Sequence, residues 1–198
     1  MAAVKDYNAA YAKLPGPQSR IQYQSLTGPS RYRLVLPYSA WAELDSPTPA
    51  ANNADLARIN MRIQACFEST TTVITELLPD LSTPGLTDPP ILLRIARTRI
   101  RPDKVDEWKA LVKNELLPAY KKAGRTLTVR QVRFGTPTNE FFVTTRVANW
   151  AEAGKNPVLE AMGQEAYDRM VAKLTAITTL RELDVFRYRS DMSYSPPR

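Results

Sequence analysis

The apolar positions of this 198-residue chain recur with two different periods. Apolar residues spaced three or four apart predict a helix from Asp103 to Gly124 and another from Pro157 to Leu174. Period-two runs predict strands at 91–101, 127–134, 141–147 and 183–189. This order, βαββαβ, predicts a ferredoxin-like α+β unit in the second half of the chain.

The first half repeats the pattern without an opening strand. It shows a helix at about residues 5–11, two short strands around Gly28, a helix carrying Leu56 and Ile63, and a strand at 72–78. The opening strand of a βαββαβ sheet is central, so its loss would leave two inner ladders open. We therefore expect either an N-terminally truncated form or a strand borrowed from a partner chain.

Short motifs recur in the same order in both halves. Trp41-Ala42-Glu43 and Trp150-Ala151-Glu152 lie 109 residues apart, and Asp80-Leu81-Ser82 is matched by Asp191-Met192-Ser193. Such agreement predicts a tandem duplication, with a first repeat at 1–84, a linker at 85–90 and a second repeat at 91–198. Because the two tryptophans recur at one position, we expect both to have a packing role.

The charge balance favours anionic partners but no nucleic acid. The chain has 27 Lys and Arg against 20 Asp and Glu, a net charge of +7, and its basic residues are scattered rather than clustered. The sequence 140–144 lacks the glycines and the leading basic residue of an RNA-recognition strand, so RNA binding is only a remote alternative. The sequence contains no run of eighteen apolar residues, so it predicts no membrane span.

The chain has no histidine and a single cysteine. The missing histidine excludes Ser-His-Asp and Cys-His catalysis and histidine-based zinc sites, so neither a metal nor a cofactor is expected. Cys66 cannot form an internal disulfide, and we expect it on the apolar face of a helix. The compartment stays open: a soluble protein that is cytoplasmic, or exported after removal of a leader.

Arginines on the predicted strands are the candidate ligand-binding residues. Arginine offers paired donors to a carboxylate, phosphate or phenolate, and tyrosine offers a hydroxyl. The alternative is that these side chains are solvated or ion-paired with nearby acids, and that the asparagine among them caps a turn. The candidates are Arg97, Arg99, Arg130, Arg146, Arg187, Tyr188 and Asn149.

Tandem βαββαβ units with a tryptophan after the third strand resemble the dimeric α+β barrel superfamily, which includes the antibiotic-biosynthesis-monooxygenase, EthD and NIPSNAP-like families. The resemblance implies two ferredoxin-like units packed sheet against sheet in an intrachain α+β barrel, the first lacking its N-terminal strand. Its haem-dependent members use a histidine ligand, which this chain does not have.

The resemblance implies a small organic molecule bound in the barrel, with a cofactor-independent oxygenase or isomerase as the activity, and the strand arginines favour an anionic ligand. Whether the protein is an enzyme stays open, because no general base is evident. The alternative is a non-catalytic, stress-related or scaffold barrel. The chain would be a monomer with a pseudo-dimeric barrel, or a homodimer.

Overall fold

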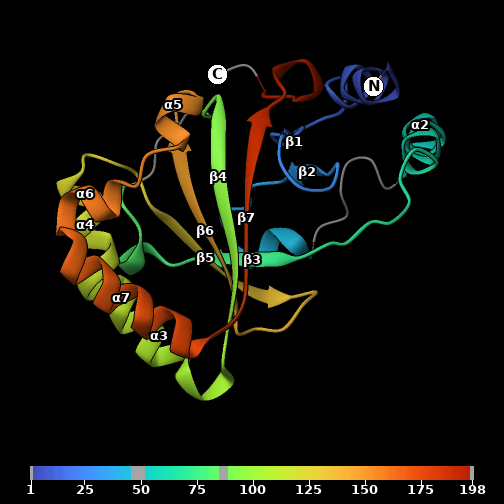
Figure 1. Cartoon of the computed structure of the whole chain (residues 1–198). Coiled ribbons are helices and arrows are strands. Elements are labelled where there is room, and N and C mark those ends of the chain that lie inside the picture. The colour runs from blue at the N-terminus through green and yellow to red at the C-terminus, as the bar shows by residue number, and fades with distance from the viewer. Residues whose placement is uncertain (1, 46–51, 85–88, 197–198) are drawn as a thin grey trace. The chain divides into compact units, whose positions relative to one another are not determined.

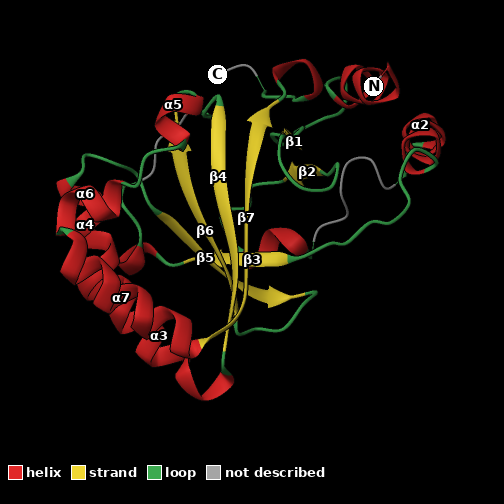
Figure 2. Ribbon diagram, viewed as in Figure 1, coloured by secondary structure: helices red, strands yellow, loops and turns green. Residues whose placement is uncertain are grey.

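A computed structural model describes residues 2–45, 52–84 and 89–196 (Figure 1). The chain splits into two compact units. Unit 1 comprises 1–25, 29–70 and 188–198, and unit 2 comprises 26–28 and 71–187. Both contain helices and antiparallel strands, so the α+β class is confirmed (Figure 2). Most of the predicted linker lies outside the described residues.

The sheet of unit 2 has β4 at its centre, between β6 and β7, as expected for the opening strand of a βαββαβ unit. β6 continues to β5, which pairs with β3, and all these pairs are antiparallel. The first half of the chain thus supplies an edge strand to this sheet. The strands are β3 (Ile74–Leu77), β4 (Leu92–Ile100), β5 (Thr128–Phe134), β6 (Glu140–Val147) and β7 (Thr178–Tyr188).

The helices of unit 2 cover one face of this sheet (Figure 2). The predicted helix after β4 continues through Pro118. Proline has no N–H to donate to the preceding turn, but a π turn directly before it accommodates the missing hydrogen bond. Gly163, with φ +82°, divides the next predicted helix into two. The elements are η3 (Pro102–Lys104), α3 (Val105–Leu111), η4 (Val112–Leu116), α4 (Leu117–Lys122), α5 (Trp150–Ala153), α6 (Pro157–Met162) and α7 (Gln164–Ile177).

The main core of unit 2 lies between these helices and the sheet. The Trp108 ring is 4.2 Å from that of Phe141, centroid to centroid, and both side chains are almost completely buried. Val112, Leu127 and Val129 surround them. Burying side chains of this size stabilises the fold by about 1.5–3 kcal/mol each.

Unit 1 is built around aromatic rings. Tyr7, Tyr11 and Leu56 form its buried cluster, and Tyr194 packs edge-on against Tyr11. Arg20 lies over the ring of Tyr7, 4.5 Å from its centroid. The elements are α1 (Ala2–Tyr11), β1 (Ile21–Ser25), β2 (Tyr32–Val35), η1 (Trp41–Leu44), α2 (Ala54–Gln64) and η5 (Ser190–Met192); η2 (Pro79–Leu81) belongs to unit 2.

The repeated serines make the same hydrogen bonds, each inside its own unit. Ser82 Oγ donates to the carbonyl four residues earlier (2.8 Å) and accepts from the N–H of Val129 (2.9 Å). Ser193 Oγ donates to the carbonyl four residues earlier (2.8 Å) and accepts from the N–H of Gln22 (2.9 Å). Through these hydrogen bonds each serine connects the short turn before it to a neighbouring strand.

The repeated Trp-Ala-Glu motifs also share one local interaction. The carboxylates of Glu43 and Glu152 each accept a hydrogen bond from the backbone N–H four residues earlier. Neither tryptophan is buried in a core: Trp41 is 50% exposed and Trp150 is 51% exposed. The glutamate that fixes each turn explains the recurring motif better than a core position for the ring.

Cys66 does not lie on a buried helix face. The helix α2 ends at Gln64, two residues earlier, and the cysteine is exposed, with its Sγ 3.4 Å from the carbonyl of Arg62. The prediction of a core position was wrong, because the apolar pattern continued past the end of the helix.

Gly135, in the turn between β5 and β6, is expected to tolerate no side chain. Its φ is +101°, and a Cβ there would overlap the carbonyl oxygen of Thr72, just before β3. We expect Gly135→Ala to lower the free energy of unfolding by roughly 2–4 kcal/mol, measured by urea denaturation. Gly154→Ala is the control, because its φ is not positive and the nearest atom lies 3.6 Å away. Equal losses in the two variants would contradict the steric argument.

Candidate functional site

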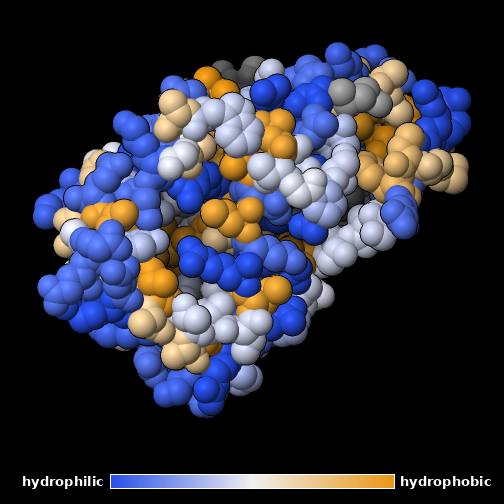
Figure 3. Space-filling model, viewed as in Figure 1, coloured by the Kyte–Doolittle hydropathy of each residue, from blue (hydrophilic) through white to orange (hydrophobic). Residues whose placement is uncertain are grey.

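Unit 2 contains a cavity of about 340 Å³ between its sheet and the helices that cover it. Apolar side chains are visible in the hollow between helices and strands (Figure 3). The volume falls within the usual range for pockets that hold small organic molecules. The cavity is lined by Arg94, Ala96, Thr98, Trp108, Leu116, Tyr120, Val143, Thr145, Ala153, Gly154, Lys155, Asn156, Pro157, Val158, Tyr167, Met170, Val171, Leu174, Thr178, Arg181 and Leu183.

A small residue at the middle of the sheet makes room for this space. Ala96 on β4 lies between Val143 on β6 and Leu183 on β7 in the strand register. Alternate residues of a strand point to the same side, so Arg94, Ala96 and Thr98 share the face towards the helices. A methyl group at the centre of this face leaves volume that a larger side chain would fill.

The wall opposite the sheet is mostly apolar. Trp108 from α3 and Met170 from α7 are each 2% exposed, and Leu116 and Leu174 lie beside them. The π turn that ends at Leu116 belongs to this wall. These side chains favour an apolar or aromatic ligand body, because contact with them removes apolar surface from water.

Tyr120 supplies a hydroxyl group inside this apolar environment. Burial raises the pKa of Tyr120; the nearby charges of Arg94 and Arg181 and a hydrogen bond with Thr145 oppose that change without cancelling it. The phenol therefore stays protonated near neutral pH and is able to donate a hydrogen bond to a ligand.

The cavity lining carries three cationic side chains and no acidic one. Arg94, Lys155 and Arg181 are the cations, and Arg94 also donates to the backbone carbonyl of Lys155 at 3.3 Å. Within the described part of the chain, neither guanidinium is paired with a carboxylate. The cavity is thus electrostatically suited to an anion.

Arg97 and Arg99 lie on the opposite face of β4 and are held by Glu140, whose side chain is fully buried. Arg97 Nε is 2.7 Å from Oε1, and Arg99 Nη2 is 3.0 Å from Oε2. Burial alone would raise the pKa of Glu140, but these hydrogen bonds outweigh it and hold the pKa below its ordinary value. The two arginines are therefore ion-paired, the alternative considered from the sequence.

The other candidate residues are dispersed. Arg130 and Arg187 are exposed on β5 and β7, and Arg146 borders a much smaller void beside the cavity. Asn149 accepts from the N–H of Glu152 at 2.9 Å and so caps α5. In unit 1, the ring of Tyr188 packs against that of Tyr23 at 5.8 Å. None of the seven candidates lines the larger cavity.

The period-two pattern of β4 already marked cavity residues that were not among the candidates predicted from the sequence. The face carrying Arg94, Ala96 and Thr98 has a charge, a methyl group and a hydroxyl where a strand packed under helices usually has large apolar residues. Tyr120 and Arg181 had no such signal, because only the tertiary structure brings them to this face.

No three His, Cys, Asp or Glu side chains in residues 2–45, 52–84 and 89–196 converge as a metal site. No helix in the same ranges has both the length and the apolar character needed to cross a bilayer.

The chain matches no known protein-family profile and no curated protein, but solved structures share its fold. A candidate monooxygenase from Fusobacterium nucleatum superimposes with a TM-score of 0.61 at 10% identity, over 99% of this chain and 89% of that one. An anthrone oxidase-like protein gives 0.64 at 8%, over 100% and 87%. A candidate monooxygenase from Lactobacillus acidophilus gives 0.51 at 11%, over 97% and 86%. The chain thus shares the fold of these solved structures.

Proposed function

We propose that unit 2 binds a small, anionic organic molecule in its cavity and acts on it as a cofactor-independent oxygenase. The observation that carries the proposal is the 340 Å³ cavity, which has an apolar wall and a cationic but no acidic lining. The names of the structural neighbours, two monooxygenases and an anthrone oxidase-like protein, support the choice of oxygenase over isomerase.

Oxygenation without a cofactor requires a substrate that itself supplies electrons to O2. For a methylene group between two electron-withdrawing rings, the balanced change is R2CH2 + O2 → R2CO + H2O: two C–H bonds break, one oxygen atom enters the carbonyl and the other leaves as water. The lining contains no carboxylate or imidazole to act as a base. The substrate must therefore ionise by its own acidity, and the cationic side chains of the lining would stabilise the anion.

In this proposal Tyr120 is a hydrogen-bond donor and not a base. Its pKa is raised by burial, so the hydroxyl is protonated where the reaction would run. Its bond with Thr145 would orient it towards the oxygen on which negative charge develops.

We also propose that the chain is a tandem duplication of a ferredoxin-like unit, with repeats at 1–84 and 91–198, closing into an intrachain barrel. The matching hydrogen bonds of Ser82 and Ser193, and of Glu43 and Glu152, support it. The same proposal includes a relationship to the NIPSNAP-like proteins. It also includes an oligomeric state that is either monomeric or homodimeric.

Trp108 allows ligand binding to be measured directly. In a Trp41→Phe, Trp150→Phe background, the buried Trp108 is the single fluorophore of its kind. We expect 2-naphthoate to quench its fluorescence with saturation and the neutral 2-naphthamide to bind more weakly. Arg94→Gln should weaken naphthoate binding by roughly tenfold, since it removes a charged donor. Arg187→Gln, on the exposed part of β7, is the matched control.

Oxygenase activity needs its own assay. We expect the protein to accelerate O2 consumption by 1,8-dihydroxyanthrone, measured with an oxygen electrode, and Arg94→Gln to reduce that rate. Binding without faster O2 consumption would overturn the oxygenase and leave the alternative, a non-catalytic binding protein. No saturable quenching by either naphthalene probe or by the anthrone would overturn the ligand site itself.

A further inference from the structure

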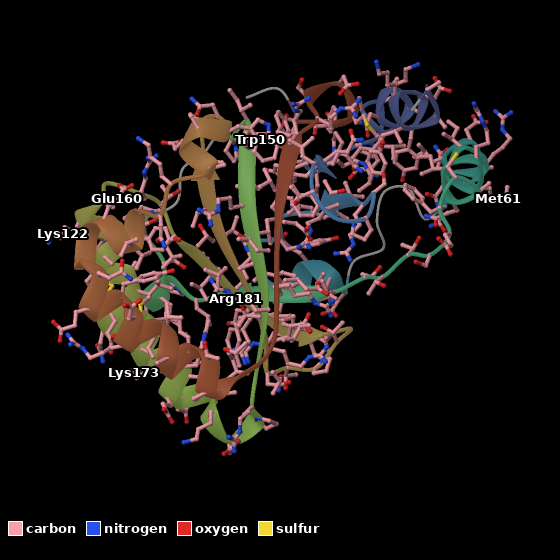
Figure 4. The ribbon with its side chains drawn as sticks, in the orientation of Figure 1. Met61, Lys122, Trp150, Glu160, Lys173 and Arg181 are labelled. Carbon is pink, nitrogen blue, oxygen red and sulfur yellow. The ribbon has the colours of Figure 1, made fainter. Side chains whose placement is uncertain are left out.

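The two arginines of the cavity lining start from different rows of the sheet. Arg94 and Thr98 are four residues apart on β4, which corresponds to about 13 Å along the strand. Arg181 on β7 pairs in register with Thr98. The backbone positions of Arg94 and Arg181 thus lie at opposite ends of the exposed floor. Figure 4 labels Arg181 where β7 runs beside β4.

The floor between these ends carries no charge. Ala96, Val143 and Leu183 occupy the row that separates Arg94 from Arg181. The wall above them is formed by Leu116 and Met170 among other apolar side chains. A ligand that reaches both arginines must therefore have an apolar middle section.

The arginines on the two faces of the sheet differ in their ion-pair partners. Arg97 and Arg99, on the face away from the cavity, share the buried carboxylate of Glu140. Arg94 and Arg181, on the cavity face, have no carboxylate partner among the residues that the structure describes. A single anionic group bound at one end would leave the arginine at the other end without a countercharge.

We propose that the ligand of this cavity carries two acidic groups, one at each end of a flat apolar body; the inference rests on the cavity being the ligand site, as proposed above. The class comprises aromatic dicarboxylates and molecules with one carboxylate and one acidic phenol. One acidic group lies at Arg94, within reach of the Tyr120 hydroxyl, and the other at Arg181. The apolar body lies over Ala96, against Trp108.

The Arg94 and Arg181 ends of the cavity contribute unequally to ligand affinity. Arg94 is half-buried, and Arg181 is exposed. Water and salt screen an exposed charge more strongly, so the Arg94 end contributes more affinity and the Arg181 end contributes mainly discrimination between one acid and two.

The test compares 2,6-naphthalenedicarboxylate with 2-naphthoate, titrated against the Trp108 fluorescence of the full chain in the Trp41→Phe, Trp150→Phe background. The two probes share one ring system and differ by one carboxylate. We expect the dianion to bind about three- to tenfold more tightly at low ionic strength. That ratio should fall towards one as salt is raised.

The variant Arg181→Gln identifies the second end. We expect it to weaken dicarboxylate binding to the level of the monoacid, while monoacid binding changes by less than about twofold. Arg187→Gln, on the same strand but outside the cavity lining, should leave the ratio of the two affinities unchanged.

The possible failures are separable. If neither probe binds, the proposed function fails, and this inference fails with it. If both acids bind with equal affinity, the cavity is a ligand site but the two-acid ligand is overturned. A loss of both affinities by the same factor in Arg181→Gln would also overturn it, because the second acid would then contribute nothing of its own.

Discussion

Glu140→Gln is expected to lower the free energy of unfolding by roughly 2–4 kcal/mol. The substitution keeps the shape of a fully buried side chain but removes the charge that Arg97 and Arg99 share. Breaking a buried ion pair usually costs more, but both arginines are about one-third exposed, so water partly compensates them. Urea denaturation measures the loss. An unchanged midpoint would show that the buried carboxylate is not needed for stability.

The effect should depend on pH with a definite sign. The pKa of Glu140 is held below its ordinary value of 4.5, so the folded protein binds its proton less readily than the unfolded chain. The contribution of the carboxylate is fully present above about pH 4.5 and is lost as the pH falls through the lower folded pKa. The stability difference between wild type and Glu140→Gln should therefore be constant near neutral pH and shrink in acid.

The matched control is Glu76→Gln. Glu76 pairs with Arg133, but both side chains are more than one-third exposed. An exposed pair contributes about 0–1 kcal/mol, so this variant should be nearly as stable as the wild type. Comparable losses in the two glutamate variants would argue against burial as the cause.

Ala96→Leu should abolish ligand binding in the unit 2 cavity while preserving the fold. The added atoms would extend from the middle of the floor into space that the 340 Å³ cavity already provides. Overpacking a filled core costs about 1–3 kcal/mol, but an existing cavity accommodates the side chain with a smaller loss or a gain. We expect at least about a 30-fold weakening of 2-naphthoate binding, read from Trp108 fluorescence.

Ala172→Leu, on the exposed side of α7, is the control. It adds the same atoms outside the cavity and should leave both binding and unfolding unchanged. If Ala96→Leu binds 2-naphthoate as tightly as the wild type does, the ligand does not occupy the cavity. If Ala96→Leu instead fails to fold, Ala96→Val tests the same argument with a smaller side chain.

The helices and strands of unit 2 were largely determined by the sequence, because their periodic apolar residues describe a local property of the chain. The strand at 91–101 and the hairpin strands agree closely with β4, β5 and β6. The βαββαβ order also places β4 at the centre of its sheet, as observed.

The repeated motifs were visible in the sequence, but their physical role was not. Recurrence marked Trp41 and Trp150, whereas the structure assigns the local interaction to Glu43 and Glu152. A hydrogen bond from a carboxylate to a backbone N–H leaves no periodic pattern, so only coordinates could distinguish it from a buried ring.

The candidate site depended most on tertiary structure. The sequence showed that arginines are frequent on the strands, but not that Glu140 neutralises Arg97 and Arg99 while Arg94 and Arg181 face a cavity. The partners of a charge are set by strand register and by the helices packed above the sheet, which are non-local. Composition and periodicity thus determined the α+β class and the net positive charge, and packing alone decided which arginines line the cavity.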